Sequence, residues 1–156
     1  MIKAKLKLKL KRFLRPVPQP AFASIALLLL RLIVGTAFVF HGWGKIQTPF
    51  SWMPPQAPVQ IPAFFQFLAA ISEFGGGIAW ILGLLTPIAS MGIGCTMTIA
   101  VYMHLIVRHD PFVNPTGGMS YEPALVYWGI AFLILVLGPG KFSLDNKIFG
   151  ERTETK

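Results

Sequence analysis

The sequence predicts an all-α membrane protein, a bundle of four transmembrane helices with both termini in the cytoplasm. Of the 156 residues, 54% are hydrophobic and only 13% are charged, far from the balance of ordinary soluble proteins. The apolar residues fall into four segments, each near the roughly twenty residues that cross the core of a bilayer. Basic residues gather at the two ends of the chain, as is typical of cytoplasmic flanks.

The chain divides into three parts. Residues 1–20 alternate lysine with leucine and then add arginines and prolines, which predicts a basic arm lying against anionic lipid headgroups. Residues 21–140 form the four-helix transmembrane domain, and residues 141–156 form a cytoplasmic tail. The alternative for the N-terminal region is a cleaved signal peptide. The apolar segment that follows the arm is longer than the apolar region of a signal peptide, and no small-residue cleavage site follows it.

Proline placement fixes the helix starts. Pro62, Pro87 and Pro123 each stand at the beginning of an apolar segment, where proline is accepted because the first turn needs no backbone donor. Thr86-Pro87 therefore joins two helices in a tight hairpin. The four predicted helices cover residues 21–44, 62–85, 87–107 and 122–137.

The distribution of basic residues predicts the orientation in a bacterial inner membrane. With the N-terminus inside, the seven Lys and Arg of the arm and the four of the tail lie in the cytoplasm, and only Lys45 and Arg108 lie outside. The formal net charge of +8 would suggest nucleic acid if it formed a patch on a soluble fold. Because the charges lie at the chain ends, we expect lipid and not nucleic acid as the partner.

Arg31 lies near the middle of the first apolar segment. An unpaired cation at that depth costs upward of about 2.5 kcal/mol, so a partner is expected. Counting about 1.5 Å per residue from the helix ends places Arg31 and Glu73 at nearly the same depth. The sequence therefore predicts an Arg31–Glu73 ion pair, either as part of a functional site or as a structural clasp that holds the bundle together.

Further polar residues lie toward the outer side of the bundle. His41 and Lys45 share a helix face with Arg31, His104 lies near the end of the third helix, and Glu122 begins the fourth. Together they predict a polar track that opens outward from Arg31 and Glu73. Simpler roles are open for three of them: Lys45 and His104 as interfacial residues, and Glu122 as an acid favoured by a helix N-terminus.

Small residues favour close helix packing. Gly76 and Gly77, in the triplet that begins at Gly75, let a neighbouring helix approach, or leave room for a flat ligand. The single cysteine, Cys95, allows no intrachain disulfide and no Cys-x-x-Cys motif, so we expect it to be a small packing residue between helices. No metal site is predicted.

Five short motifs follow one another along the chain. They are Leu-Leu-Arg31-Leu, Phe40-His41-Gly42 with Lys45, Glu73-Phe-Gly-Gly-Gly77, Leu82-Gly-Leu-Leu-Thr-Pro87, and Gly138-Pro-Gly-Lys-Phe-Ser-Leu-Asp145. Together they resemble the DoxX family of small four-helix bacterial membrane proteins. The resemblance runs from about Leu27 to Asp145, nearly all of the chain outside the basic arm and the last residues. In that family the last motif commonly has Arg where this chain has Lys141, a difference that keeps the charge.

The resemblance implies a subunit of a quinone-linked oxidoreductase, working with other membrane or redox subunits, some of them linked to oxidative stress. It makes two groups of residues candidates. The catalytic candidates are Glu73, His41, His104 and Glu122, and the ligand-binding candidates are Arg31, Lys45, Gly76 and Gly77. Quinone is the implied cofactor, and a small anionic or sulfur substrate is the other ligand considered.

Two other functions fit the same residues. His41 and His104 sit at similar depths on different helices, so they could ligate a b-type haem. A non-enzymatic scaffold or a small-molecule transporter is also open, because a basic outer funnel would attract anions. Four short helices give little room for alternating access unless the protein forms a homo-oligomer.

Overall fold

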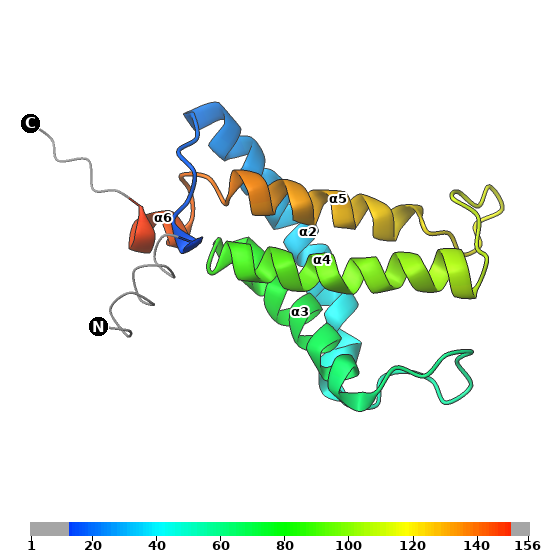
Figure 1. The fold of residues 1–156 in the computed structure, drawn as a ribbon. Helices are drawn as coiled ribbons and strands as arrows, with labels where there is room; N and C mark the ends of the chain where they lie inside the picture. Colours follow the sequence, from blue (N-terminus) through cyan, green and yellow to red (C-terminus); the bar gives the residue numbers. More distant parts are fainter. Residues whose placement is uncertain (1–12, 151–156) are drawn as a thin grey trace, which may run out of the picture.

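The computed structural model describes residues 13–150, and the regular secondary structure of that part consists of helices, without strands (Figure 1). The predicted arm and tail therefore fall partly, at residues 1–12 and 151–156, outside the described residues. The helices are α2 (Ala21–Gln47), α3 (Ala63–Leu82), α4 (Thr86–Tyr102), the π-helical turn η1 (Met103–Val107), α5 (Glu122–Leu137) and α6 (Leu144–Phe149).

Three of these helices are long and apolar enough to cross a membrane: α2, α3, and α4 together with η1. Helix α5 is also apolar but shorter, with 16 residues. The prediction of an all-helical membrane protein is confirmed. The predicted helix ends differ from the observed ends by three residues or fewer, the largest differences being at Gln47 and Leu82.

Helices α2 and α3 form one closely packed pair. A Cβ atom added at Gly77 of α3 would lie 2.7 Å from the carbonyl oxygen of Gly35 and 2.8 Å from the backbone nitrogen of Val39, both in α2. At Gly42 an added Cβ would lie 2.7 Å from Cα of Phe74. The glycines thus permit backbone contact between the two helices, as small residues do in lipid.

Helices α4 and α5 form the second pair and run side by side (Figure 1). A tight turn joins α3 to α4: Gly83 ends α3 in the left-handed conformation with a φ of 62°, and Leu85 follows with a φ of 50°. The core lies where the pairs meet, with Phe38, Trp80 and Ile93 almost completely buried. Large apolar side chains cover the outward helix faces, as expected of a surface in contact with lipid.

The environment of Cys95 differs from the prediction. Its side chain is exposed on α4 and is not packed between helices. The helix turns its buried face, with Ile93 and Met97, toward the core. Cys95 lies off that face and lines a shallow groove with Trp128 and Phe132 of α5.

Candidate functional site

Arg31 is 1% exposed and is bound by backbone carbonyl groups at one end of the bundle. Its Nε donates to the carbonyl of Trp80 at 2.8 Å, and Nη2 donates to that of Phe142 at 3.1 Å and, more weakly, to that of Ile81 at 3.4 Å. Nη1 donates to the carbonyl of Pro139. Because Trp80 and Ile81 lie in the last turn of α3, the cation also faces the negative end of that helix dipole.

The predicted Arg31–Glu73 pair is therefore wrong. Arg31 and Glu73 would lie at the same depth only if the first two helices ended at the same level. Instead, Gly35 packs against Gly77 and Ile81, so Arg31, one turn earlier, lies beside the end of α3. Glu73 lies more than two turns away along α3. Helix α2 has 27 residues against 20 in α3 and extends past it at the Arg31 end.

Residues 138–145, which we call the closing segment, complete the surroundings of Arg31. The carboxylate of Asp145, fully buried, accepts hydrogen bonds from the backbone nitrogens of Leu85 at 2.7 Å and Thr86 at 2.8 Å, which begin α4. The backbone nitrogen of Asp145 donates to the carbonyl of Gly83 at 2.8 Å. We call Arg31, Gly83, Pro139 and Asp145 the clasp, and this end of the bundle the clasp end. These contacts agree with the second role considered for Arg31, a structural clasp that holds the bundle together.

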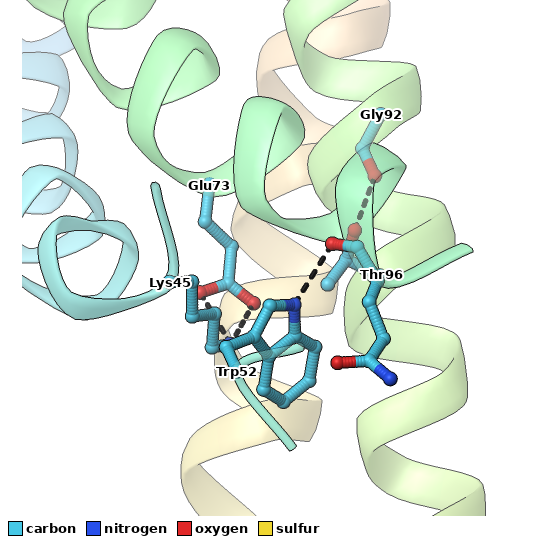
Figure 2. Close-up of polar contacts among 6 residues, drawn as sticks. Lys45, Trp52, Glu73, Gly92 and Thr96 are labelled. Atoms are coloured by element: carbon cyan, nitrogen blue, oxygen red, sulfur yellow. Dashed lines mark hydrogen bonds and ion pairs between the residues drawn. The ribbon is translucent and has the colours of Figure 1, made fainter. Parts of the chain in front are cut away.

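Glu73 pairs instead with Lys45, at the opposite end of α2. Lys45 Nζ lies 2.5 Å and 2.6 Å from the two carboxylate oxygens. Figure 2 shows the two side chains pointing toward each other. The Glu73 side chain is 2% exposed and that of Lys45 is 27% exposed. The ammonium group also lies 4.7 Å from the ring centre of Trp52, in the loop formed by residues 48–62. This cation–π contact ties the loop to the ion pair.

The same loop is fixed to α3 through Gln66. The indole nitrogen of Trp52 donates to the backbone carbonyl of Gln66 at 2.8 Å. The Gln66 side chain accepts from the backbone nitrogen of Met53 at 3.0 Å and donates to the carbonyl of Ile61 at 2.8 Å. We call the end of the bundle with this loop and the loop of residues 108–121 the loop end.

A pocket of about 380 Å³ lies at the loop end, between the α2–α3 pair and the α4–α5 pair. In Figure 1, α3 diverges from α4 toward this end. The pocket brings together three predicted site residues, His41, Glu73 and His104. Its remaining lining residues are Phe38, Met97, Ala100, Gly118, Met119, Ser120, Pro123, Ala124 and Tyr127.

Aromatic rings form one wall of this pocket. The ring centres of Phe38 and Tyr127 are 5.1 Å apart, and those of His41 and Tyr127 are 5.9 Å apart. Phe38 also packs edge-on against Trp80 of the core at 5.6 Å. The contact with Trp80 therefore supports this wall, which presents a flat apolar surface beside the His41 imidazole.

His104 lies on the π-helical turn and is paired with Asp110. Its Nδ1 is 2.7 Å from Oδ2 of Asp110, and the backbone nitrogen of Asp110 donates to the carbonyl of His104 at 2.9 Å. His109, between them, has a left-handed backbone with a φ of 56°. This conformation reverses the chain and returns Asp110 to His104.

Asp110 and Tyr127 were not among the predicted site residues. A signal for Tyr127 was present, because Pro123, Ala124 and Tyr127 have the spacing of one helix face. No local pattern indicated Asp110, since its approach to His104 depends on the π-helical turn and on the left-handed His109. Neither feature is specified by a recognisable motif.

The other predicted site residues lie outside the pocket. Glu122 begins α5 next to the lining residue Pro123 but does not line the pocket itself. Gly77 packs against α2, and a Cβ at Gly76 would lie 3.1 Å from the Ile93 side chain, so helices fill the space before both glycines. Among residues 13–150, no group of three or more His, Cys, Asp or Glu side chains could hold a metal ion.

Comparisons with known proteins identify relatives over most of the chain. The DoxX family model matches residues 26–106. "Inner membrane protein YqjF" of Escherichia coli is 27% identical over 124 residues, covering 79% of this chain and 92% of that protein. An uncharacterized protein of Haemophilus influenzae is 32% identical over 126 residues, covering 79% and 90%. An uncharacterized membrane protein of Mycobacterium tuberculosis is 30% identical over 132 residues, covering 79% and 81%. No solved structure matches.

Proposed function

Because the chain belongs to the DoxX family, we propose that it is the quinone-binding membrane subunit of an oxidoreductase, with the quinone ring held in the loop-end pocket. It is a multi-pass protein of a bacterial inner membrane. Electrons would be exchanged with a partner redox protein, and the pocket would supply binding, orientation and hydrogen bonds to the ring oxygens.

The arrangement of the pocket wall carries this proposal. Phe38 and Tyr127 offer aromatic surface at which a flat ring can stack, and His41 of α2 and His104 of η1 offer polar atoms. A mostly apolar cavity with a few convergent polar groups is the usual form of a small-molecule site. The Glu73–Lys45 pair, at the edge of the pocket, adds a carboxylate that can exchange protons with a bound ligand.

Binding of a short-chain benzoquinone to the purified protein in detergent tests the proposal. Equilibrium dialysis should show saturable binding to the wild-type protein. Ala124→Phe places a ring in the pocket and should reduce binding at least tenfold. Leu125→Phe is the matched control, since Leu125 is exposed and does not line the pocket. No saturable binding to the wild type, or equal binding by both variants, would overturn the proposal.

We also propose four membrane crossings with both termini in the cytoplasm. Support comes from the clasp end, where the side chain of Gln19, before α2, donates to the carbonyl of Leu137 at 3.1 Å, and the backbone nitrogen of Lys141 donates to the hydroxyl of Ser24 at 3.1 Å. The two ends of the described chain thus meet on one side. If α2, α3 and α4 cross, α5 must cross as well to return there.

Reporter fusions test this topology. Green fluorescent protein fused after residue 150 should fluoresce, and alkaline phosphatase fused after residue 118 should be active. The reverse pattern at either site would contradict the proposed topology.

A haem protein is the second candidate, because His41 and His104 line the same pocket from α2 and η1. Two histidines on different helices are a familiar haem ligand set. The visible spectrum of the membrane-extracted protein distinguishes the two candidates. A Soret band that is lost in both His41→Gln and His104→Gln would favour haem over quinone.

A further inference from the structure

The His104–Asp110 pair fixes which nitrogen of the imidazole carries hydrogen. An ionised carboxylate can only accept hydrogen bonds, so the 2.7 Å contact with Oδ2 places hydrogen on Nδ1. In the neutral ring, Nε2 is then a hydrogen-bond acceptor. Among residues 13–150, no hydrogen bond to Nε2 is present, and His104 lines the pocket.

The backbone holds Asp110 in this position by three separate features. The π-helical turn closes with a bond from the nitrogen of Arg108 to the carbonyl of Met103 at 3.0 Å. His109 adopts a left-handed conformation, which costs a non-glycine residue free energy. The backbone nitrogen of Asp110 then bonds to the carbonyl of His104. Such turns and strained residues occur preferentially at functional sites.

We infer that the pocket selects the reduced, hydroxyl-bearing form of its ring ligand through Nε2 of His104. This inference rests on the proposed function and specifies its substrate. A hydroquinone O–H group can donate to Nε2, and the ring can stack on the wall formed by Phe38 and Tyr127. A quinone carbonyl can only accept, so opposite Nε2 it would leave two acceptors facing each other without a proton.

The preference depends on the charge of His104. A protonated imidazole would make Nε2 a donor, which suits a carbonyl, so the selectivity for hydroquinone belongs to the neutral ring. The other titratable groups around the pocket are His41 from α2, Glu73 from α3 with its partner Lys45, and Tyr127 from α5. Arg108 and His109 lie in the segment that joins His104 to Asp110.

Anaerobic equilibrium dialysis with one short-chain benzoquinone, in its oxidised and reduced forms, tests the inference at neutral pH. We expect the wild-type protein to bind the hydroquinone about tenfold more tightly, the effect of about 1.4 kcal/mol from one misplaced buried hydrogen bond. Asp110→Asn should remove the preference, because the amide can donate to Nδ1 and so permit the other tautomer. Lys147→Gln is the control, since Lys147 is an exposed charge at the clasp end and its replacement keeps the Asp110 carboxylate.

A second measurement reads the tautomer directly. The ¹⁵N chemical shifts of the His104 imidazole, observed by NMR with His41 and His109 replaced by Gln, should show hydrogen on Nδ1. A neutral ring with hydrogen on Nε2 would overturn the inference, even if Asp110→Asn fails to fold.

The outcomes separate the two proposals. If the wild type binds neither form, the proposed function fails. If it binds both forms equally, or if Asp110→Asn leaves the preference unchanged, the proposed function stands and the selectivity inference fails.

Discussion

Lys45 contacts both carboxylate oxygens of Glu73, at 2.5 Å and 2.6 Å, and so pairs the loop end of α2 with the middle of α3. Replacing Glu73 with Gln should leave the ammonium group without its counter-charge. We expect a loss of about 1–3 kcal/mol in the free energy of unfolding, below the 3–5 kcal/mol of a fully buried pair because Lys45 is partly exposed.

Thermal unfolding in detergent measures this coupling through a double-mutant cycle. Glu73→Gln and Lys45→Met should each destabilise the protein, and the double variant should cost less than the sum of the two. Additive effects would show that the two side chains do not stabilise each other.

Arg31→Lys should destabilise the clasp although it keeps the charge. The guanidinium donates from three nitrogens to carbonyls of both α3 and the closing segment, and a lysine ammonium cannot reproduce that fork. We expect a loss of about 3 kcal/mol or more, since buried carbonyls lose their donors. Limited proteolysis of membranes should show faster cleavage after residue 137, whereas Lys147→Met, an exposed charge at the same end, should match the wild type.

Gly77→Ala should weaken the packing of α2 on α3. The added methyl group would meet backbone atoms of α2 at 2.7 Å and 2.8 Å, and backbone cannot move aside easily. Overpacking of this kind costs about 1–3 kcal/mol. Gly75→Ala is the matched control, because its methyl group would meet only the Ile71 side chain at 3.8 Å. Equal melting temperatures for the two variants would contradict the close helix contact.

Asp145→Asn should destabilise the start of α4. The carboxylate accepts two backbone hydrogen bonds, from Leu85 and Thr86, and an amide oxygen paired with an NH₂ group can satisfy only one of them. The expected cost is about 1–2 kcal/mol, as for other lost helix caps. Hydrogen exchange at Leu85 and Thr86 should rise in the variant and stay unchanged in Asn146→Asp, which alters the neighbouring exposed residue.

The helices could be predicted from the sequence because apolar length and proline placement are local signals. Pro62, Pro87 and Pro123 gave the starts of three helices within one residue. Helix ends were less certain, since α2 continues three residues beyond Gly44. A glycine near a helix end does not by itself stop a helix.

Contacts between helices were harder to predict. The pairing of Arg31 with Glu73 required the relative level of two helices, and no sequence pattern fixes that level. It is set by the close approach of Gly35 to Gly77 and of Gly42 to Phe74. His41, Glu73 and His104, three members of the predicted polar track, nevertheless line one pocket, whereas Arg31 lies at the other end of the bundle.

Helix α2, with its 27 residues, is about 40 Å long, whereas the hydrocarbon core of a bilayer is about 30 Å thick. Tilting from the membrane normal is one way in which a bilayer accommodates a helix of this length. In a tilted α2, lipid thickness would act on the angle between α2 and its neighbours, and so on the width of the opening between the two helix pairs. Ligand affinity measured in bilayers of different acyl-chain length would detect this mechanical link between membrane and pocket.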